Sequence, residues 1–270
     1  MEKENYCIKG YITNLGKYNE GELIGEWISF PITKKELDKV LKRIGITNEI
    51  DRFGRCYEEY FMTDYDGEYP SCVYDLLGEY TSIKTLNKIA LALEKVSQAG
   101  VQEQFIAFLE HSNDIFGACA NAINGNGLYI SGSDYSDLAH FFIDETGGIE
   151  NLSNETTQYY FDYDMFGRDI RIEFYNEDNP EQTAEEFYCS DENATDEEIG
   201  QAYIEMCGFE SVANKEYYFD YEEYGRMMFT DGSYISTDNG YVDCSDYDDS
   251  LGEDFEKELE EELDEEKGER

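Results

Sequence analysis

Negative charge is spread unevenly along this chain of 270 residues, and that distribution limits how the chain can fold. Residues 1–100 hold 17 acidic and 13 basic side chains, whereas residues 101–270 hold 46 and 7, so the net charge of −43 falls almost entirely in the second part. Like charges repel one another in a compact state. Aromatic residues make up 15% of the chain, however, and disordered acidic chains are poor in them, so we expect most of the chain to fold.

The charge also restricts the partners. It excludes nucleic acid and favours a basic protein, divalent cations or plain solubility. The chain has no apolar run of 18 residues, and its N-terminal segment lacks the apolar core of a signal peptide. The seven cysteines are odd in number and form no CxxC pair, which is typical of reduced thiols. We therefore expect a cytoplasmic protein without membrane contact.

The first 70 residues carry the pattern of a small α+β domain. Alternating apolar residues predict strands from Tyr6 to Leu15, from Leu23 to Phe30 and from Tyr57 to Thr63. Between the last two strands, Thr33 and Glu36 have the spacing of a helix-capping box, and Gly45 stands just past the predicted end of that helix.

The next segment has helical periodicity. Predicted helices cover 83–97, 101–109 and 115–123, followed by a short strand at 127–130. The apolar positions of the first helix fall on one face: Leu86, Ile89, Ala90, Leu93 and Val96.

The third region contains an internal repeat. Residues 159–170 read YYFDYDMFGRDI and residues 217–228 read YYFDYEEYGRMM, while DLAHFFIDETGG at 137–148 parallels EIGQAYIEMCGF at 198–209. The offsets are 58 and 61 residues. Each copy predicts a helix, a glycine turn, a second helix with the tyrosine-rich segment, a Gly-Arg pair and a strand. Two copies are too few for a solenoid.

These patterns predict an α+β fold with short antiparallel sheets. We expect an α+β domain at 1–69, a mainly helical domain at 70–132, acidic repeat domains at 133–190 and 191–245, and an acidic tail at 246–270. In the tail, apolar residues recur every four positions at Leu251, Phe255, Leu259 and Leu263. Because like charges at i,i+4 weaken a helix, we expect this one to fray unless it docks.

The sequence offers no catalytic or metal motif. It has only two histidines, His111 and His140, which we expect on helix surfaces, and it has neither a nucleophile elbow nor a phosphate-binding glycine loop. The aspartate-rich turns at 64–67 and 246–250 miss the EF-hand register, which needs Gly at position 6 and Glu at position 12. We expect no enzyme, no cofactor and no dedicated metal site. A calcium-responsive or generic acidic interaction module remains the alternative.

The charge itself is the positive signal. B-form DNA carries one negative charge per roughly 1.7 Å of helix axis, so a net charge of −43 matches roughly 70 Å of duplex, or on the order of twenty base pairs. An acidic protein of this kind can compete for the basic groove of a DNA-handling enzyme. Solubility is the alternative reading of the same charge.

Several segments resemble the ArdA antirestriction family. The first is Tyr11 to Trp27, with the specific core YNEGELIGEW from Tyr18 onward. The others are 79–83 with the helix that follows, Leu138 to Arg168 with the motifs DETG and YDMFGR, and Tyr221 to Arg226 followed by GSYIST at 232–237. Together they span residues 6 to about 243.

The resemblance implies an elongated row of small domains, usually a homodimer, whose carboxylates follow the phosphates of bent B-form DNA. Family members bind Type I restriction-modification enzymes and are carried by conjugative plasmids and transposons. This chain departs from the family in its duplicated last domain and its acidic tail. Since the family dimerises through the last domain, the second copy either replaces the partner subunit or lengthens the dimer; the family-like ending at 232–237 favours a longer homodimer.

The resemblance and the charge together assign candidate residues. Trp27, Tyr18 and Leu23 are expected in core or hairpin packing, Gly21 and Gly25 in turns, and the two tyrosine-rich runs in core and inter-domain packing. The candidates for imitation of DNA are the helix-borne carboxylates of the repeats, for each of which simple solvation is the alternative role: Asp137, Asp144, Glu145, Asp162, Asp164, Asp169, Glu197, Glu198, Glu205, Asp220, Glu222 and Glu223.

Overall fold

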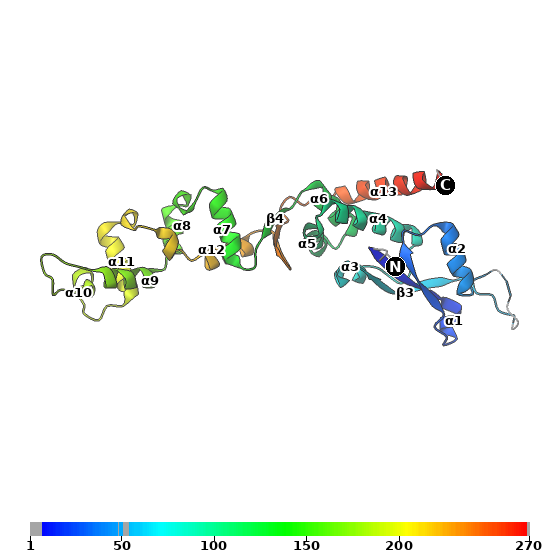
Figure 1. The fold of residues 1–270 in the computed structure, drawn as a ribbon, viewed down its shortest axis with the longest axis horizontal. Coiled ribbons are helices and arrows are strands. Elements are labelled where there is room, and N and C mark those ends of the chain that lie inside the picture. Colours follow the sequence, from blue (N-terminus) through cyan, green and yellow to red (C-terminus); the bar gives the residue numbers. More distant parts are fainter. Residues whose placement is uncertain (1–6, 48, 51–53, 269–270) are drawn as a thin grey trace, which may run out of the picture. The chain divides into compact units, whose positions relative to one another are not determined.

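The chain divides into two compact units. A computed structural model describes residues 7–47, 49–50 and 54–268, with side chains to residue 264 (Figure 1). The terminal unit contains residues 1–129, 235–237 and 242–270, and the repeat unit contains residues 130–234 and 238–241. The expected tail lies in the same unit as residues 1–129, and most of the two repeat copies lies in the other unit.

The terminal unit begins with a three-stranded antiparallel sheet of order β2-β1-β3, formed by β1 (Ile8–Asn14), β2 (Gly25–Phe30) and β3 (Tyr60–Gly67). The short helix α1 (Leu15–Asn19) follows β1, and α2 (Lys34–Arg43) follows β2. Thr33 and Glu36 form the predicted capping box of α2, and Gly45 beyond its end has a φ of +79°. Tyr6, where the first strand was expected to begin, lies outside the described residues.

The helical part of the terminal unit matches its predicted periodicity. It contains α3 (Ser71–Asp75), α4 (Ile83–Ala99), α5 (Gln102–Ser112) and α6 (Ile115–Asn124). Five apolar positions of α4 are buried, as their spacing predicted: Leu86, Ile89, Ala90, Leu93 and Val96. They join the apolar residues of the sheet and of α5 and α6 in one hydrophobic cluster.

The acidic tail forms α13 (Leu251–Gly268), which packs on α6 and α4 within the terminal unit (Figure 1, red). Its predicted apolar stripe is the packed face: Leu259 is completely buried, and Leu251, Phe255 and Leu263 are half-buried. Gly252 lies so close to Gly117 of α6 that a Cβ there would stand 3.0 Å from its backbone nitrogen. The tail is therefore a docked helix, the condition under which the sequence predicted that it would not fray.

The repeat unit is mainly helical. Its elements are α7 (Tyr135–Glu145), η1 (Ile149–Asn151), α8 (Asn154–Tyr159), α9 (Tyr163–Glu173), α10 (Ala184–Tyr188), α11 (Asp196–Cys207), η2 (Phe209–Ser211), η3 (Lys215–Tyr218) and α12 (Tyr221–Asp231). A second sheet, of order β4-β6-β5, is built from β4 (Leu128–Ser131), β5 (Tyr234–Thr237) and β6 (Gly240–Asp243). The fold is α+β with short sheets, as the sequence predicted.

The two repeat copies exchange their helices. The helix α7 of the first copy packs against α12 of the second, and α11 of the second packs against α9 of the first (Figure 1). Each packed pair thus takes one helix from each of the expected domains 133–190 and 191–245. Neither copy closes on itself, because the apolar face of each first helix is covered by the other copy's second helix.

Two glycines make this exchange possible. The repeat pattern predicted that the Gly-Arg pairs follow the second helices, but Gly167 lies inside α9 and Gly225 inside α12. A Cβ on Gly167 would lie 1.7 Å from the carbonyl oxygen of Asp196, and one on Gly225 would lie 1.8 Å from that of Tyr135. The backbones approach too closely for any side chain, which explains why helix-weakening glycines occupy these interior positions.

The copies also meet at an isolated antiparallel bridge between Phe161 and Phe219. The backbone N–H of Asp162 donates to the carbonyl of Tyr218 at 2.7 Å, and the N–H of Asp220 donates to the carbonyl of Tyr160 at 2.8 Å. Since 162 and 220, like 160 and 218, are equivalent repeat positions, the contact is reciprocal. Residue i contacts j and j contacts i, as at the interface of a symmetric dimer, but here within one chain.

Candidate partner-binding surface

Eight of the twelve candidate carboxylates lie at or within the first turn of a helix: Asp137 on α7, Asp162 and Asp164 on α9, Glu197 and Glu198 on α11, and Asp220, Glu222 and Glu223 on α12. The other four lie farther along these helices, at Asp144, Glu145, Asp169 and Glu205. Asp137, Asp169 and Glu222 are half-buried, and the other nine are exposed. The partial positive charge of a helix N-terminus stabilises a carboxylate placed beside it, which offsets some of the repulsion in this unit.

Two of these carboxylates are helix caps at equivalent repeat positions. The side chain of Asp162 accepts a hydrogen bond from the N–H of Met165 at 2.8 Å, and that of Asp220 accepts one from the N–H of Glu223 at 2.9 Å. The alternative role considered from the sequence was solvation. In the structure these two residues are also the N-caps that stabilise the first turns of α9 and α12.

Two further carboxylates are held in the same way. Glu198 forms a capping box with Thr195 at the start of α11. The carboxylate of Asp137 accepts the N–H of Ser133 at 2.7 Å, and this bond to the backbone lowers the pKa of Asp137. Hydrogen bonds therefore fix the direction of several acidic groups instead of leaving them free in solvent.

Arginines neutralise only part of this surface. Arg168 pairs with Asp164 at 2.7 Å, and the equivalent Arg226 pairs with Glu222 at 3.3 Å and Glu223 at 3.7 Å. The repeat unit contains 28 acidic and 4 basic side chains, a net charge of −24. The terminal unit contains 35 and 16, a net charge of −19 in a larger number of residues. The repeat unit is thus the more negative part.

The signature residues of the N-terminal hairpin are partly exposed. Core or hairpin packing was expected for Trp27, Tyr18 and Leu23; they are 44%, 49% and 62% exposed and do not lie in the core. Hairpin packing does occur, because the Trp27 ring meets that of Tyr11, its cross-strand partner, at 5.4 Å. A β-hairpin has one face directed away from the sheet's core, and the alternation of side chains places Trp27 there.

The two signature glycines have different roles. Gly21 has a φ of +85°, which is the turn conformation expected for it. Gly25 lies in β2 instead of a turn, and a Cβ there would stand 2.6 Å from the carbonyl oxygen of Ile12 on the neighbouring strand. Close approach between strands is the reason for this glycine.

The tyrosine-rich runs combine packing with exposure. Tyr160, Phe161 and Phe219 are buried, as expected, but Tyr159 and Tyr217 are 79% and 61% exposed. Both histidines are exposed on helices, and the ring of His140 stacks on that of Tyr221 at 3.9 Å. This stack could not be predicted from the sequence, because the two residues are 81 positions apart.

The remaining polar chemistry is limited. All seven cysteines are free, and within residues 7–47, 49–50 and 54–268 no group of three or more His, Cys, Asp or Glu side chains is placed to hold a metal ion. Among the described helices, none combines the length and the apolar composition needed to cross a membrane.

Comparison with known proteins supplies the family. Residues 10–179 match the family described as antirestriction protein (ArdA). The matched range includes the sheet, the helical part, and the repeat unit as far as the loop after α9, whereas α11, α12 and α13 lie beyond it. A search of curated proteins finds no match. Because the matched range covers well over half of the chain, the protein belongs to the ArdA family of antirestriction proteins.

Proposed function

We propose that this antirestriction protein imitates DNA: it occupies the DNA-binding groove of a Type I restriction-modification enzyme and inhibits the enzyme without catalysis or a cofactor. The observation that carries the proposal is the net charge of −24 on the repeat unit, with nine of the twelve candidate carboxylates exposed on its helices. An enzyme that binds DNA lines its groove with Lys and Arg, which meet phosphates in the same way that they would meet these carboxylates.

The capping hydrogen bonds support this proposal further. A phosphate in duplex DNA has a fixed position, and an imitation gains affinity when its charges are also held in place before binding. The carboxylates of Asp162, Asp220 and Glu198 accept hydrogen bonds from the backbone N–H groups of Met165, Glu223 and Thr195 at the starts of three helices. A surface made for solubility needs no such fixing.

The assembly is part of the proposal. The sequence favoured a homodimer, yet the reciprocal Asp162–Tyr218 and Asp220–Tyr160 hydrogen bonds place a dimer-like contact within one chain. We therefore propose that the second copy replaces a partner subunit. Light scattering after size exclusion tests this: a mass near 31.3 kDa at micromolar concentration supports it, and twice that mass contradicts it.

The functional test is plasmid restriction in cells that carry a Type I system. The protein should protect incoming unmodified plasmid. Replacing five repeat-unit carboxylates by their amides should weaken protection strongly, because binding is a sum of many weak charge contacts. The five are Asp162, Asp164, Asp220, Glu222 and Glu223.

A matched variant controls for net charge. It removes five exposed carboxylates of the terminal unit by the same kind of substitution: Asp75, Glu110, Glu253, Glu258 and Glu261. This variant should protect nearly as well as the unaltered chain. Equal restriction with and without the unaltered protein would reject the proposed function. Equal loss in the two variants would reject the placement on the repeat unit.

A further inference from the structure

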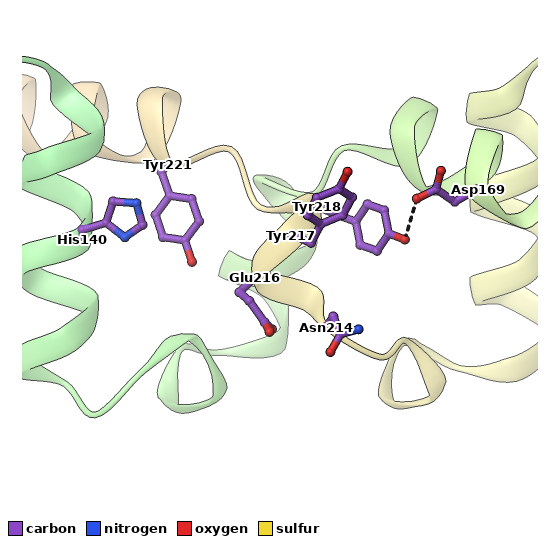
Figure 2. Close-up of a pocket in the computed structure, with 7 residues that line it drawn as sticks. All are labelled: His140, Asp169, Asn214, Glu216, Tyr217, Tyr218 and Tyr221. Carbon is purple, nitrogen blue, oxygen red and sulfur yellow. Dashed lines mark hydrogen bonds between the residues drawn. The ribbon is translucent and has the colours of Figure 1, made fainter.

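The repeat unit contains a cavity that the imitation of DNA does not by itself require. Its volume is about 730 Å³, and α7, α9, η3 and α12 contribute to its lining (Figure 2). The lining combines three tyrosines, Tyr217, Tyr218 and Tyr221, with two carboxylates, Asp169 and Glu216. Aromatic faces together with carboxylates are the chemistry that recognises organic cations.

Tyr217 leaves much of its ring exposed, whereas the ring of Tyr218 packs against Phe161 and Phe166. The rings of Tyr217 and Tyr218 stand 5.1 Å apart and nearly perpendicular, at 82°, which makes a corner of two aromatic surfaces. Tyr217 is 61% exposed although burial would stabilise so large a ring. Tyr221 is held in place by its stack on His140, and Figure 2 shows these two rings facing each other at one side of the cavity.

The carboxylates give the cavity a negative potential. The hydroxyl of Tyr218 donates to Asp169 at 3.0 Å, and the pKa of Tyr218 is raised to about 12 by burial first and then by Asp169. Burial also raises the pKa of Tyr221, followed by the charges of Glu216 and Asp144. Burial disfavours a charge of either sign, whereas the nearby carboxylates Asp169 and Glu216 oppose a further negative charge and favour a positive one.

The cations of the unit are engaged elsewhere. Among the described residues that line the cavity, His140 is the sole basic side chain. Lys215, next to Glu216, places its ammonium group over the ring of Phe209, 4.6 Å from the centroid. Arg168 and Arg226 pair with carboxylates of their own helices. An external cation would therefore meet little competition within the unit.

The repeat supplies an internal comparison. The aromatic corner recurs at the equivalent positions Tyr159 and Tyr160, whose rings are 4.9 Å apart at 75°. The polar residues differ: Gln158 is equivalent to Glu216, Met227 to Asp169 and Gln201 to His140. The corner belongs to both copies, but the carboxylates accompany it in one copy alone. The carboxylates at this cavity are therefore specific to one of the two equivalent sites, and the general acidity of the repeat unit does not account for them.

We propose that the cavity binds the guanidinium group of an arginine side chain presented by the basic partner. A planar guanidinium can stack on the exposed face of Tyr217 while its N–H groups donate to Glu216, a combination that the compact ammonium of lysine cannot reproduce. Tyrosine and arginine are the residues in which binding energy concentrates at interfaces. The identity of the partner rests on the proposed function, whereas binding of arginine does not.

The test uses the full chain with tyrosine rings labelled for NMR, titrated with N-acetyl-arginine amide and, in parallel, with N-acetyl-lysine amide. Arginine should shift the ring signals of Tyr217, Tyr218 and Tyr221 more than lysine does. Tyr217→Ala and Glu216→Gln should each weaken arginine binding roughly three- to tenfold. Tyr159→Ala, at the equivalent position, should leave it unchanged.

Melting temperatures verify folding, since Tyr217 and Tyr159 are both exposed and their replacement should leave the fold intact. Equal responses to arginine and lysine, or equal effects of Tyr217→Ala and Tyr159→Ala, would overturn the inference and leave the proposed function standing. Specific arginine binding by a chain that gives no protection from restriction would support the inference and reject the proposed function.

Discussion

The two acidic regions of this protein tolerate their charge in different ways. In the terminal unit, α13 faces a row of lysines on α4, where Lys84 and Lys88 pair with Glu260, Lys88 also pairs with Glu256, and Lys95 pairs with Glu262. In the repeat unit, carboxylates gather at helix N-termini, where backbone N–H groups donate hydrogen bonds to Asp162, Glu198 and Asp220. Ion pairing removes charge from the surface, whereas helix capping keeps it available to a partner.

The hydrophobic cores differ correspondingly. The cluster of the terminal unit is dominated by Ile, Leu, Val and Ala. The three smaller clusters of the repeat unit are rich in Phe and Tyr, such as Phe161, Phe166 and Phe209 in one of them. Large aromatic rings bury much area per residue, which suits a unit that has few apolar positions between its carboxylates. Fewer and larger contacts also make the repeat unit more sensitive to errors in backbone spacing.

The largest loss of stability should come from adding a side chain where the exchanged helices approach most closely. Gly167→Ala and Gly225→Ala each force a Cβ against a carbonyl oxygen, and each should destabilise the repeat unit by about 3 kcal/mol. Urea unfolding measures this loss. Gly78→Ala, at an exposed position with nothing closer than 3.7 Å, is the control and should cost a few tenths of a kcal/mol. If all three variants had equal stability, the close approach would not exist in solution.

Removing the anchor of the tail should have the next largest effect. Leu259 is completely buried, and Leu259→Ala should cost about 2 kcal/mol, near the low end for such a change because α13 can undock instead of keeping a cavity. Thermal unfolding measures the loss, with Leu23→Ala at a 62% exposed site as control. A wild-type melting temperature for Leu259→Ala would show that α13 contributes nothing to the terminal unit.

Substitutions of Asp162 that distinguish its capping hydrogen bond from its charge should change the stability by a smaller amount. Asp162→Ala removes both and should cost about 1 kcal/mol, whereas Asp162→Asn keeps a capping side chain and should cost a few tenths. Asp220 should behave alike, since it occupies the equivalent position. Equal losses for the Ala and Asn variants would mean that the charge, and not the hydrogen bond, holds the start of the helix.

Acidification should weaken the docking of α13 on α4, and this is the smallest of the expected effects. Hydrogen bonding to Lys84 lowers the pKa of Glu260 from its ordinary value of 4.5. A lowered folded-state pKa gives stability that is present above the ordinary value and is lost as the pH falls through the folded one. Hydrogen exchange of the α13 amides, corrected for intrinsic rates, should therefore show weaker protection below about pH 4.5 than at pH 6. Lys84→Gln should reduce this pH dependence; an unchanged dependence would exclude the pair as its cause.

Local elements could be predicted from the sequence because their signals are local. The capping box of Thr33 and Glu36, the buried face of α4 and the apolar stripe of α13 all depend on residues a few positions apart. The pairing of the repeats could not be predicted, because α9 of the same copy and α12 of the other copy offer α7 similar helix faces. Self-similarity makes the two pairings equivalent in pattern, and only the loop lengths and the backbone approach at Gly167 and Gly225 distinguish them.

The candidate site was predictable to a lesser degree. The sequence located the carboxylates but not their orientation, because a cap is recognised only when the start of its helix is known. The helix α9 begins at Tyr163, the last residue of the tyrosine-rich run, so the run itself lies mostly outside the helix. The tyrosine-rich run that contains Tyr217 and Tyr218 was expected in core and inter-domain packing. Whether a tyrosine such as Tyr217 is exposed depends on how the neighbouring helices are arranged. The composition of an aromatic run does not reveal that arrangement.

The central claim is that the repeat unit takes the place of DNA. The most direct measurement is equilibrium competition between this protein and fluorescently labelled duplex for a purified Type I restriction-modification enzyme, at several salt concentrations. We expect the protein to displace the duplex completely and its apparent affinity to fall steeply as salt rises. The amide variant of Asp162, Asp164, Asp220, Glu222 and Glu223 should compete far less well than the terminal-unit control. A stable complex of enzyme, duplex and protein together would contradict the claim.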